Sequence, residues 1–251
     1  MFARAAAVLV GLFIIAPMVV VAVMSFGAGT SLAFPPADFT LASYARYFTD
    51  PRWMGPTWNS LVIGLTSTAI TMAVTTPAAF AFALYGFRGR KVVRLLIMMP
   101  LMAPAIVMAL AYFFYFGEIG LLNTIPGVAV AHACIAVPLA FLILSAGLKS
   151  FDWTLLRASQ ASGAGPWTSF RRVCFPVLRP SFLVAALFAF INSFDETVIA
   201  LFISGRNAST LPRRMFENVR QESDPVVAVV STLLFLLVAL IATVAMMRRR
   251  S

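Results

Sequence analysis

Acidic and metal-binding side chains are scarce in this chain. Its 251 residues include 9 Asp and Glu, 1 His and 2 Cys. Cys/His metal sites need several ligands at close spacing, so no metal site is expected. Cys134 and Cys174 fall in an apolar run and in a basic loop respectively, and we expect no disulfide between them. The sequence has no visible nucleophile–base set, so neither a cofactor nor enzymatic activity is expected.

Charged residues of both signs are also few. They make up 11% of the chain, whereas hydrophobic residues make up 61%. Soluble domains contain about 45–50% apolar residues, so this composition indicates an integral membrane protein. The net charge of +10 would suit nucleic acid, but the basic residues cluster at the ends of apolar runs. We therefore expect membrane lipid, and not nucleic acid, as a partner.

The sequence lacks the phosphate-binding glycine loop GxxxxGK[ST]. The nearest fragment, residues 147–150 (GLKS), does not have the required frame. The chain is therefore not expected to bind ATP in the usual way. If ATP drives its activity, another subunit must hydrolyse it.

Six apolar runs are each long enough for a bilayer core, which needs about 20 residues per helix. They cover residues 5–26, 60–85, 95–116, 127–148, 181–204 and 225–247. The first run could be a cleaved signal peptide, but it exceeds the usual core of about 7–15 residues, which favours an uncleaved anchor. The sequence therefore predicts an all-α, polytopic membrane protein with six transmembrane helices.

Basic residues are distributed unequally between the two sides of these spans. Thirteen of the 19 Lys and Arg residues fall on the side that holds both termini. Because basic loops are retained in the cytoplasm, the N- and C-termini are predicted to be cytoplasmic. Acidic residues fall mainly on the other side, except that Asp195 and Glu196 lie within the fifth predicted span.

The segment between the fourth and fifth spans is basic, polar and able to form two short helices. Asp152 can cap the first helix, and Gly163 can end it in a left-handed conformation. Pro166 suits the first position of a second helix, which Pro176 and Pro180 are expected to end. A helix–hinge–helix loop suits a docked partner, or alternatively an anionic lipid surface.

This loop resembles the coupling loop of ABC importer permeases. The matching residues are Ala158, Ser159, Gly163, Ala164, Phe170, Val173, Pro176 and Pro180. The resemblance covers about residues 57–251 and includes NSFDETVIALFISG (192–205) and STLPRRMF (209–216), which look like permeases that import spermidine and putrescine. Arg157 departs from the pattern, because the family usually has a glutamate there that pairs with the ATPase.

The resemblance implies the transmembrane domain of a type I ABC importer in a bacterial inner membrane. A permease core at 57–247 would follow an N-terminal helix and outer loop at 1–56. The loop at 149–180 would dock one of a pair of ATPase subunits, through Arg157, Ala158, Ser159, Gly163, Ala164, Phe170 and Pro176. A second permease subunit would complete the pathway, and an extracytoplasmic binding protein would deliver a polyamine, or else another small organic ion or iron.

Polar residues near the outer end of the fifth span are the candidate substrate pathway. Asn192 and Glu196 share a helical face, with Asp195 beside them. Charged groups in a span cost roughly 2.5–3.5 kcal/mol on insertion scales, so they usually face a cavity or a partner. Tyr112 and Tyr115, near the outer end of the third span, could add aromatic walls for a polyamine, or belong to an interfacial belt.

The sequence allows several alternatives. Ser193 and Glu196 match a capping box ahead of residues 198–203, so the fifth span could break there. His132 is interpreted as a packed residue bonded across helices, in preference to a proton relay. A secondary transporter or channel would need internal pseudo-symmetry, and a membrane enzyme would need a polar catalytic cluster. The sequence displays neither feature.

Overall fold

The computed structural model describes residues 2–28, 34–221 and 224–250. Within these ranges the chain is helical apart from its turns and loops, with one isolated β-bridge between Gly27 and Phe39. Contacts divide the chain into two units. One consists of Met1–Pro56 with Arg214–Ser251, and the other of Thr57–Arg213.

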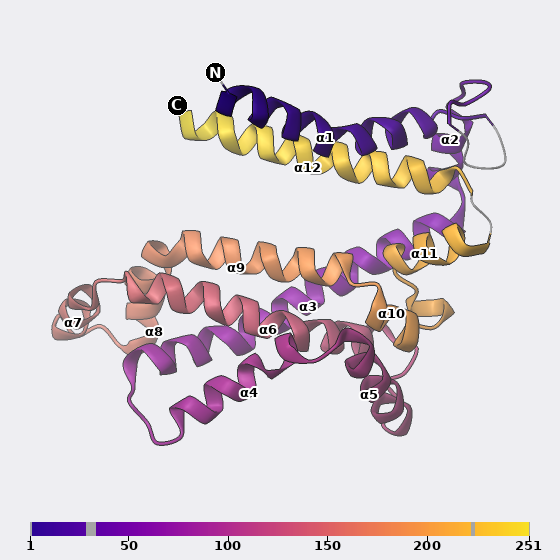
Figure 1. The fold of residues 1–251 in the computed structure, drawn as a ribbon. Helices are drawn as coiled ribbons and strands as arrows, with labels where there is room; N and C mark the ends of the chain where they lie inside the picture. Colours follow the sequence, from indigo (N-terminus) through magenta and orange to yellow (C-terminus); the bar gives the residue numbers. More distant parts are fainter. Residues whose placement is uncertain (1, 29–33, 222–223, 251) are drawn as a thin grey trace. The chain divides into compact units, whose positions relative to one another are not determined.

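The first unit brings the two ends of the chain together. Its helices are α1 (Phe2–Met24), α2 (Ala42–Thr49) and α12 (Val226–Arg250). Helices α1 and α12 pack antiparallel, and α2 also contacts α12 (Figure 1). Arg46 on α2 forms an ion pair with Asp224, whose carboxylate also accepts a hydrogen bond from the N–H of Val226 at 3.0 Å. Asp224 therefore links α2 to the first turn of α12.

The second unit contains the helices that carry the candidate site. They are α4 (Arg90–Met102), α5 (Ala105–Glu118), α6 (Ile125–Lys149), α7 (Trp153–Ala161), α8 (Pro166–Ser169), α9 (Phe175–Asp195) and α10 (Val198–Ile203). Two further helices, α3 (Pro51–Leu84) and α11 (Leu211–Gln221), cross from one unit into the other. In Figure 1, α6 and α9 lie side by side, with α7 and α8 at one end and α10 at the other.

Helix α6 is the most enclosed of the long helices. The most apolar 18-residue stretch of α6 is 61% buried. The corresponding stretches of α3 and of the helix that ends with α9 are each 28% buried. The α6–α9 contact is close because Gly147 lies against Ser181. Small residues allow such close packing, which replaces the hydrophobic effect as the source of helix association in lipid. The Nδ1 of His132 on α6 also bonds to the Oγ of Ser193 on α9 at 3.0 Å, which confirms the predicted cross-helix bond.

Three helices among the described residues are long and apolar enough to cross a membrane. They are Pro51–Leu84, Ile125–Lys149 and Pro166–Asp195. Helices α4 and α5 make a fourth span if the bent pair is counted as one. Shorter apolar helices cover Leu9–Met24 and Val226–Leu240. The described residues thus support three or four spans, and the total of six stays a prediction.

The third predicted span, 95–116, is not one straight helix. It bends by 101° between α4 and α5. Ala103 and Pro104 lie at the bend with extended ψ angles of 135° and 132°. Proline has no amide hydrogen and disfavours helical geometry in the residue before it, so Pro104 accounts for the break.

The helix after the polar loop extends further than the sequence predicts. The expectation that Pro176 and Pro180 end it is wrong, because α8, a π-helical segment (Phe170–Cys174) and α9 form one helix of 30 residues. The N–H of Phe175 bonds to the carbonyl of Phe170, five residues back. This wider turn lies directly before Pro176, where it relieves the clash between a proline ring and the preceding turn.

The packing at Gly147 gives a test of this arrangement. A Cβ on residue 147 would lie 2.7 Å from the Cβ of Ser181, an atom that no rotamer change can move. Gly147→Ala should therefore lower the free energy of unfolding by about 1–3 kcal/mol, as overpacking does. Thermal unfolding of the purified protein in detergent measures the effect.

Gly117→Ala is the matched control. Gly117 is an exposed helical glycine, and a Cβ added there would have no other atom within 4 Å. Alanine favours a helix by about 1 kcal/mol over glycine at such a position. Equal melting temperatures for the two variants would contradict the close α6–α9 contact.

Candidate functional site

The polar loop forms the predicted helix–hinge–helix. The carboxylate of Asp152 accepts hydrogen bonds from the N–H of Thr154 at 2.9 Å and from its hydroxyl at 2.6 Å. These bonds hold the pKa of Asp152 below its usual value, with a smaller contribution from the charge of Arg157. Gly163 ends α7 with φ +84°, and Pro166 is the first residue of α8. The predictions for Asp152, Gly163 and Pro166 are thus confirmed.

Contacts inside the loop hold α7 against α8. The hydroxyl groups of Ser159 and Ser169 bond at 3.0 Å, and the N–H of Ala164 bonds to the carbonyl of Ser159 at 3.2 Å. Phe170 anchors the loop to the helices around it. Its ring centroid lies 5.5–6.3 Å from four other rings, those of Phe80, Trp167, Phe175 and Phe182. Three predicted docking residues, Ser159, Ala164 and Phe170, therefore build the hinge itself.

The remaining docking candidates lie on the surface. Arg157 and Ala158 are exposed on α7, and Pro176 is exposed in the first turn of α9. Gln160 is exposed on the same short helix as Arg157. The loop therefore presents a short helix whose polar face is exposed.

A second group of predicted residues lines a cavity of about 220 Å³ at the far end of α9. Its polar lining consists of Asn192, Asp195 and Glu196, and Phe188 provides an aromatic wall. The Oδ1 of Asn192 is buried and accepts no hydrogen bond from the described part of the chain. The cavity is therefore rich in hydrogen-bond acceptors. An ammonium group, which only donates, matches such a lining.

The fifth predicted span, 181–204, is broken beside this cavity. Helix α9 ends at Asp195, Glu196 is extended, and α10 begins at Val198. The Oε1 of Glu196 accepts a hydrogen bond from the N–H of Ile199 at 2.9 Å, so this carboxylate also holds the first turn of α10. The capping box with Ser193 does not form, because Ser193 lies inside α9 and is not the residue that begins α10; its hydroxyl bonds to His132.

The two candidate tyrosines do not line this cavity. Tyr112 packs into the core around α5 and α6 and is absent from the lining of this cavity. Tyr115 is 59% exposed. The aromatic wall comes from Phe188, which the sequence reasoning missed. Its spacing of four residues before Asn192 on one helix was the signal that could have identified it.

Comparison with known proteins identifies the family of this chain. The family model described as "Binding-protein-dependent transport system inner membrane component" matches residues 72–250, a range that contains the hinge and the cavity. The chain belongs to this family. Members named below are permease proteins of transport systems, which agrees with a transport subunit that is not itself an enzyme.

Individual relatives differ in what they transport. The trehalose transport system permease SugB of Mycobacterium tuberculosis is 28% identical over 218 residues, which cover 86% of this chain and 80% of SugB. The spermidine/putrescine transport system permease PotC of Haemophilus influenzae is 27% identical over 194 residues, which cover 77% of this chain and 76% of PotC. Membership of the family therefore leaves the cargo open.

A solved structure supports the fold. It is the crystal structure of a bacterial ABC transporter involved in the import of the acidic polysaccharide alginate. One of its chains matches with a TM-score of 0.74 at 16% identity, over 99% of this chain and 95% of that chain. The chain therefore has the all-helical fold of an ABC transporter permease.

The left-handed turn at Gly163 can be tested directly. An alanine in this conformation costs roughly 1–2 kcal/mol, so Gly163→Ala should open the hinge more often. Backbone amides across residues 153–169 should then exchange with solvent roughly tenfold faster in hydrogen–deuterium exchange mass spectrometry.

Gly165→Ala is a closely matched control. Both glycines have open space where a Cβ would be placed, but Gly165 has φ −65°, which alanine adopts readily. Its exchange should stay near that of the unmodified protein. Equal acceleration in both variants would show that the left-handed turn does not hold the loop.

Proposed function

We propose that this chain is the permease subunit of an ATP-driven ABC importer that carries polyamines. The proposal rests mainly on one observation: a single helix, Pro166–Asp195, begins beside the docking hinge and ends at the acceptor-rich cavity. In this proposal an ATPase docks on α7, and the cavity lies on the path of the substrate. The family and the fold support the importer, and the chemistry of the cavity supports the polyamine.

Three features of the loop support docking: the exposed helix α7, the left-handed turn at Gly163, and the aromatic contacts that hold Phe170. The exposed face of α7 is the surface that an ATPase would contact, and the Ser159–Ser169 bond would keep α7 and α8 moving together. Arg157 replaces the usual glutamate in the permease pattern. Its guanidinium would therefore pair with an acidic side chain of the ATPase, a reversal of the expected charge arrangement.

Transmission of movement rests on the continuity of the helix from Pro166 to Asp195. At 1.5 Å per residue, its 30 residues span about 45 Å. When paired ATPases close and displace the docking loop, a stiff helix of this length would carry the displacement to the cavity. This is the rigid-element mode by which packed helices switch between discrete arrangements.

The cargo is inferred from the lining of the cavity. Asn192, Asp195 and Glu196 provide acceptors, while Phe188 and Ile191 provide apolar walls. A polyamine has ammonium groups separated by methylene segments, so it pairs with both parts of this lining. A neutral sugar would leave two carboxylates without a counter-charge. Another small organic cation, or iron, is the alternative that the same lining allows.

The proposal extends to the assembly. The chain would form half of the translocation pathway and pair with a second permease, two ATPase subunits and an extracytoplasmic binding protein. It would cross the bacterial inner membrane six times, with both termini in the cytoplasm. The division into a helix and outer loop at 1–56, a permease core at 57–247 and a docking loop at 149–180 belongs to the same proposal.

Reversal of the charge at Arg157 tests the docking contact. Arg157→Glu should turn an attraction of up to about 1 kcal/mol into a repulsion of similar size and weaken ATPase association by up to about thirtyfold. Co-purification of the ATPase and substrate-stimulated ATP hydrolysis report the effect. Arg88→Glu changes by the same charge an exposed arginine that lies before α4, outside the docking loop at 149–180, and should leave both nearly unchanged. Normal coupling in Arg157→Glu would remove this side chain from the contact.

Neutralisation of Asp195 tests the cargo. Asp195→Asn removes one negative charge from the cavity with little change in volume, so uptake of labelled putrescine should fall roughly tenfold, as expected for a lost charge-assisted hydrogen bond. Glu118→Gln is the control, because Glu118 is exposed at the end of α5 and does not line the cavity. Unchanged uptake by Asp195→Asn, at normal assembly, would place this carboxylate outside the pathway.

A further inference from the structure

A basic pocket opens at the end of the second unit that carries α7. Its volume is about 230 Å³, and helices α3, α4, α6 and α7 line it. The polar lining consists of Arg90 and Arg94 from α4, Ser145 and Lys149 from α6, and Trp153 from α7. Every one of these side chains can donate a hydrogen bond, and the lining contains no carboxylate.

No carboxylate among the described residues lines the pocket beside these three cations. The ion pairs Arg46–Asp224 and Arg52–Asp50 both lie in the first unit, away from this pocket. The guanidinium carbons of Arg90 and Arg94 lie 5.6 and 5.7 Å from the ring centroid of Phe82, and Arg90 also donates to the carbonyl of Phe82. Phe82 therefore holds both guanidinium groups at the pocket wall, while Lys149 approaches from another helix.

Ser145 supplies an independent indication of a ligand. Its Oγ is buried and has no hydrogen-bond partner among the described residues, yet Ser145 lines the pocket. An unpartnered buried hydroxyl group costs free energy, and a ligand that accepts a hydrogen bond removes that cost. The pocket thus offers three positive charges and one free hydroxyl donor to an anion with several acceptor oxygens, as in a phosphate group.

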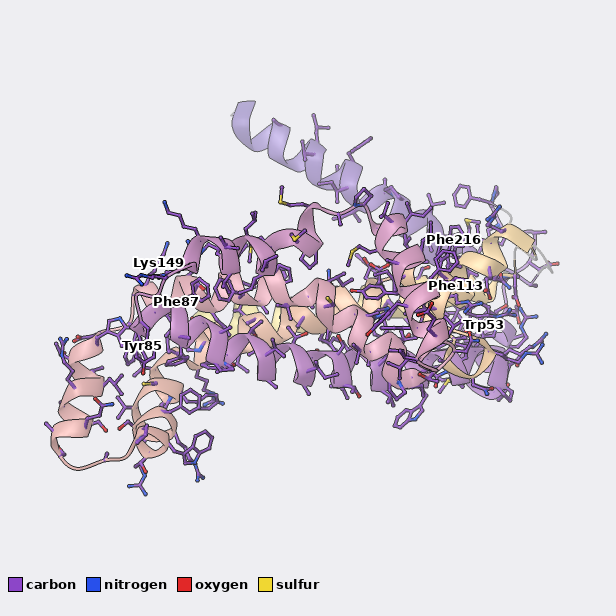
Figure 2. The ribbon with its side chains drawn as sticks, turned by 90° about the horizontal axis from the view of Figure 1, so that it is seen from below. Trp53, Tyr85, Phe87, Phe113, Lys149 and Phe216 are labelled. Atoms are coloured by element: carbon purple, nitrogen blue, oxygen red, sulfur yellow. The ribbon has the colours of Figure 1, made fainter. Side chains whose placement is uncertain are left out.

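The surroundings of the pocket are apolar. Val92, Leu95 and Leu96 on α4 are 57–60% exposed, directly beside Arg94 in the sequence. Figure 2 shows Lys149 at the same end of the second unit as the aromatic residues Tyr85 and Phe87. Aromatic and basic residues gather where a span meets the membrane surface, and the exposed aliphatic residues of α4 provide a surface for acyl chains.

We propose that this pocket binds the phosphate of an anionic phospholipid headgroup. The lipid would place its phosphate among Arg94, Lys149 and Ser145, and its acyl chains along the exposed apolar face of α4. Because Trp153 is the first residue of α7, the bound headgroup would also contact the base of the docking helix. The site would thus make the stability of that helix depend on lipid composition. This inference needs neither the polyamine cargo nor the ATPase contact.

General attraction of basic loops to membranes would not produce this arrangement. Arg88 and Lys91 belong to the same basic segment but do not line the pocket. They therefore provide a matched pair for the test. Arg94→Gln with Lys149→Gln removes two charges from the pocket, and Arg88→Gln with Lys91→Gln removes two charges from its neighbourhood.

Native mass spectrometry of the full chain in detergent, titrated with phosphatidylglycerol, measures the binding. The pocket pair should weaken binding roughly thirtyfold, since each basic residue near a membrane surface contributes about fivefold. The control pair should change it by less than about twofold. Ser145→Ala should weaken it about fivefold, as one hydrogen bond does, and guards against misfolding of the charge variant. Equal losses in the two pairs, or no loss in either, would overturn the proposal.

A second arm separates a lipid from a soluble anion. Inorganic phosphate, added at the same concentration, shares the headgroup chemistry but has no acyl chains. The proposal predicts that it displaces phosphatidylglycerol poorly. It also predicts that zwitterionic phosphatidylcholine, whose choline cation offsets the charge of its phosphate, binds at least tenfold more weakly. Displacement by phosphate at equal concentration would assign the pocket to a soluble anion and overturn the lipid assignment.

Discussion

One uninterrupted helix, from Pro166 to Asp195, is the constraint on which the functional arrangement depends. A backbone inside a membrane has to satisfy its own hydrogen bonds, so two prolines near the start of a span threaten its continuity. The π-helical segment Phe170–Cys174 meets this demand by widening the turn before Pro176. As a result, one helix runs from Pro166, just after the hinge glycine, to Asp195 at the cavity.

Helix α6 supports this element along much of its length. Gly147 allows close contact near the docking end, and the His132–Ser193 bond links the two helices near the cavity. Beyond Asp195 the helix stops, and Glu196 starts α10 in a new direction. A displacement of α7 would therefore reach the cavity through α9, which α6 supports by packing against it. The basic pocket lies beside the base of α7, where a lipid headgroup could stiffen the same element.

Features that depend on a few adjacent residues could be predicted from the sequence. Asp152 caps the start of α7, and Gly163 ends α7 in a left-handed conformation. Pro166, which has no N–H to donate, occupies the first position of α8. The continuation past Pro176 could not be predicted, because it depends on a wider turn formed upstream. The cavity wall depends on how α5 and α9 are rotated about their axes, which tertiary packing decides. The periodicity therefore indicated Asn192 and Asp195 correctly as neighbours, but not the choice of Phe188 over Tyr112.

The central claim is that α7 is the surface on which an ATPase docks, and site-specific cross-linking tests it most directly. With both native cysteines replaced by alanine, Gln160→Cys places a thiol on the exposed face of α7, and Ile119→Cys places one after α5, outside the docking loop. The complex, purified with its co-expressed ATPase, is then treated with a short bifunctional thiol reagent. The account predicts a permease–ATPase cross-link from position 160 and none from position 119. A cross-link from position 119 alone, or equal yields from both, would contradict it.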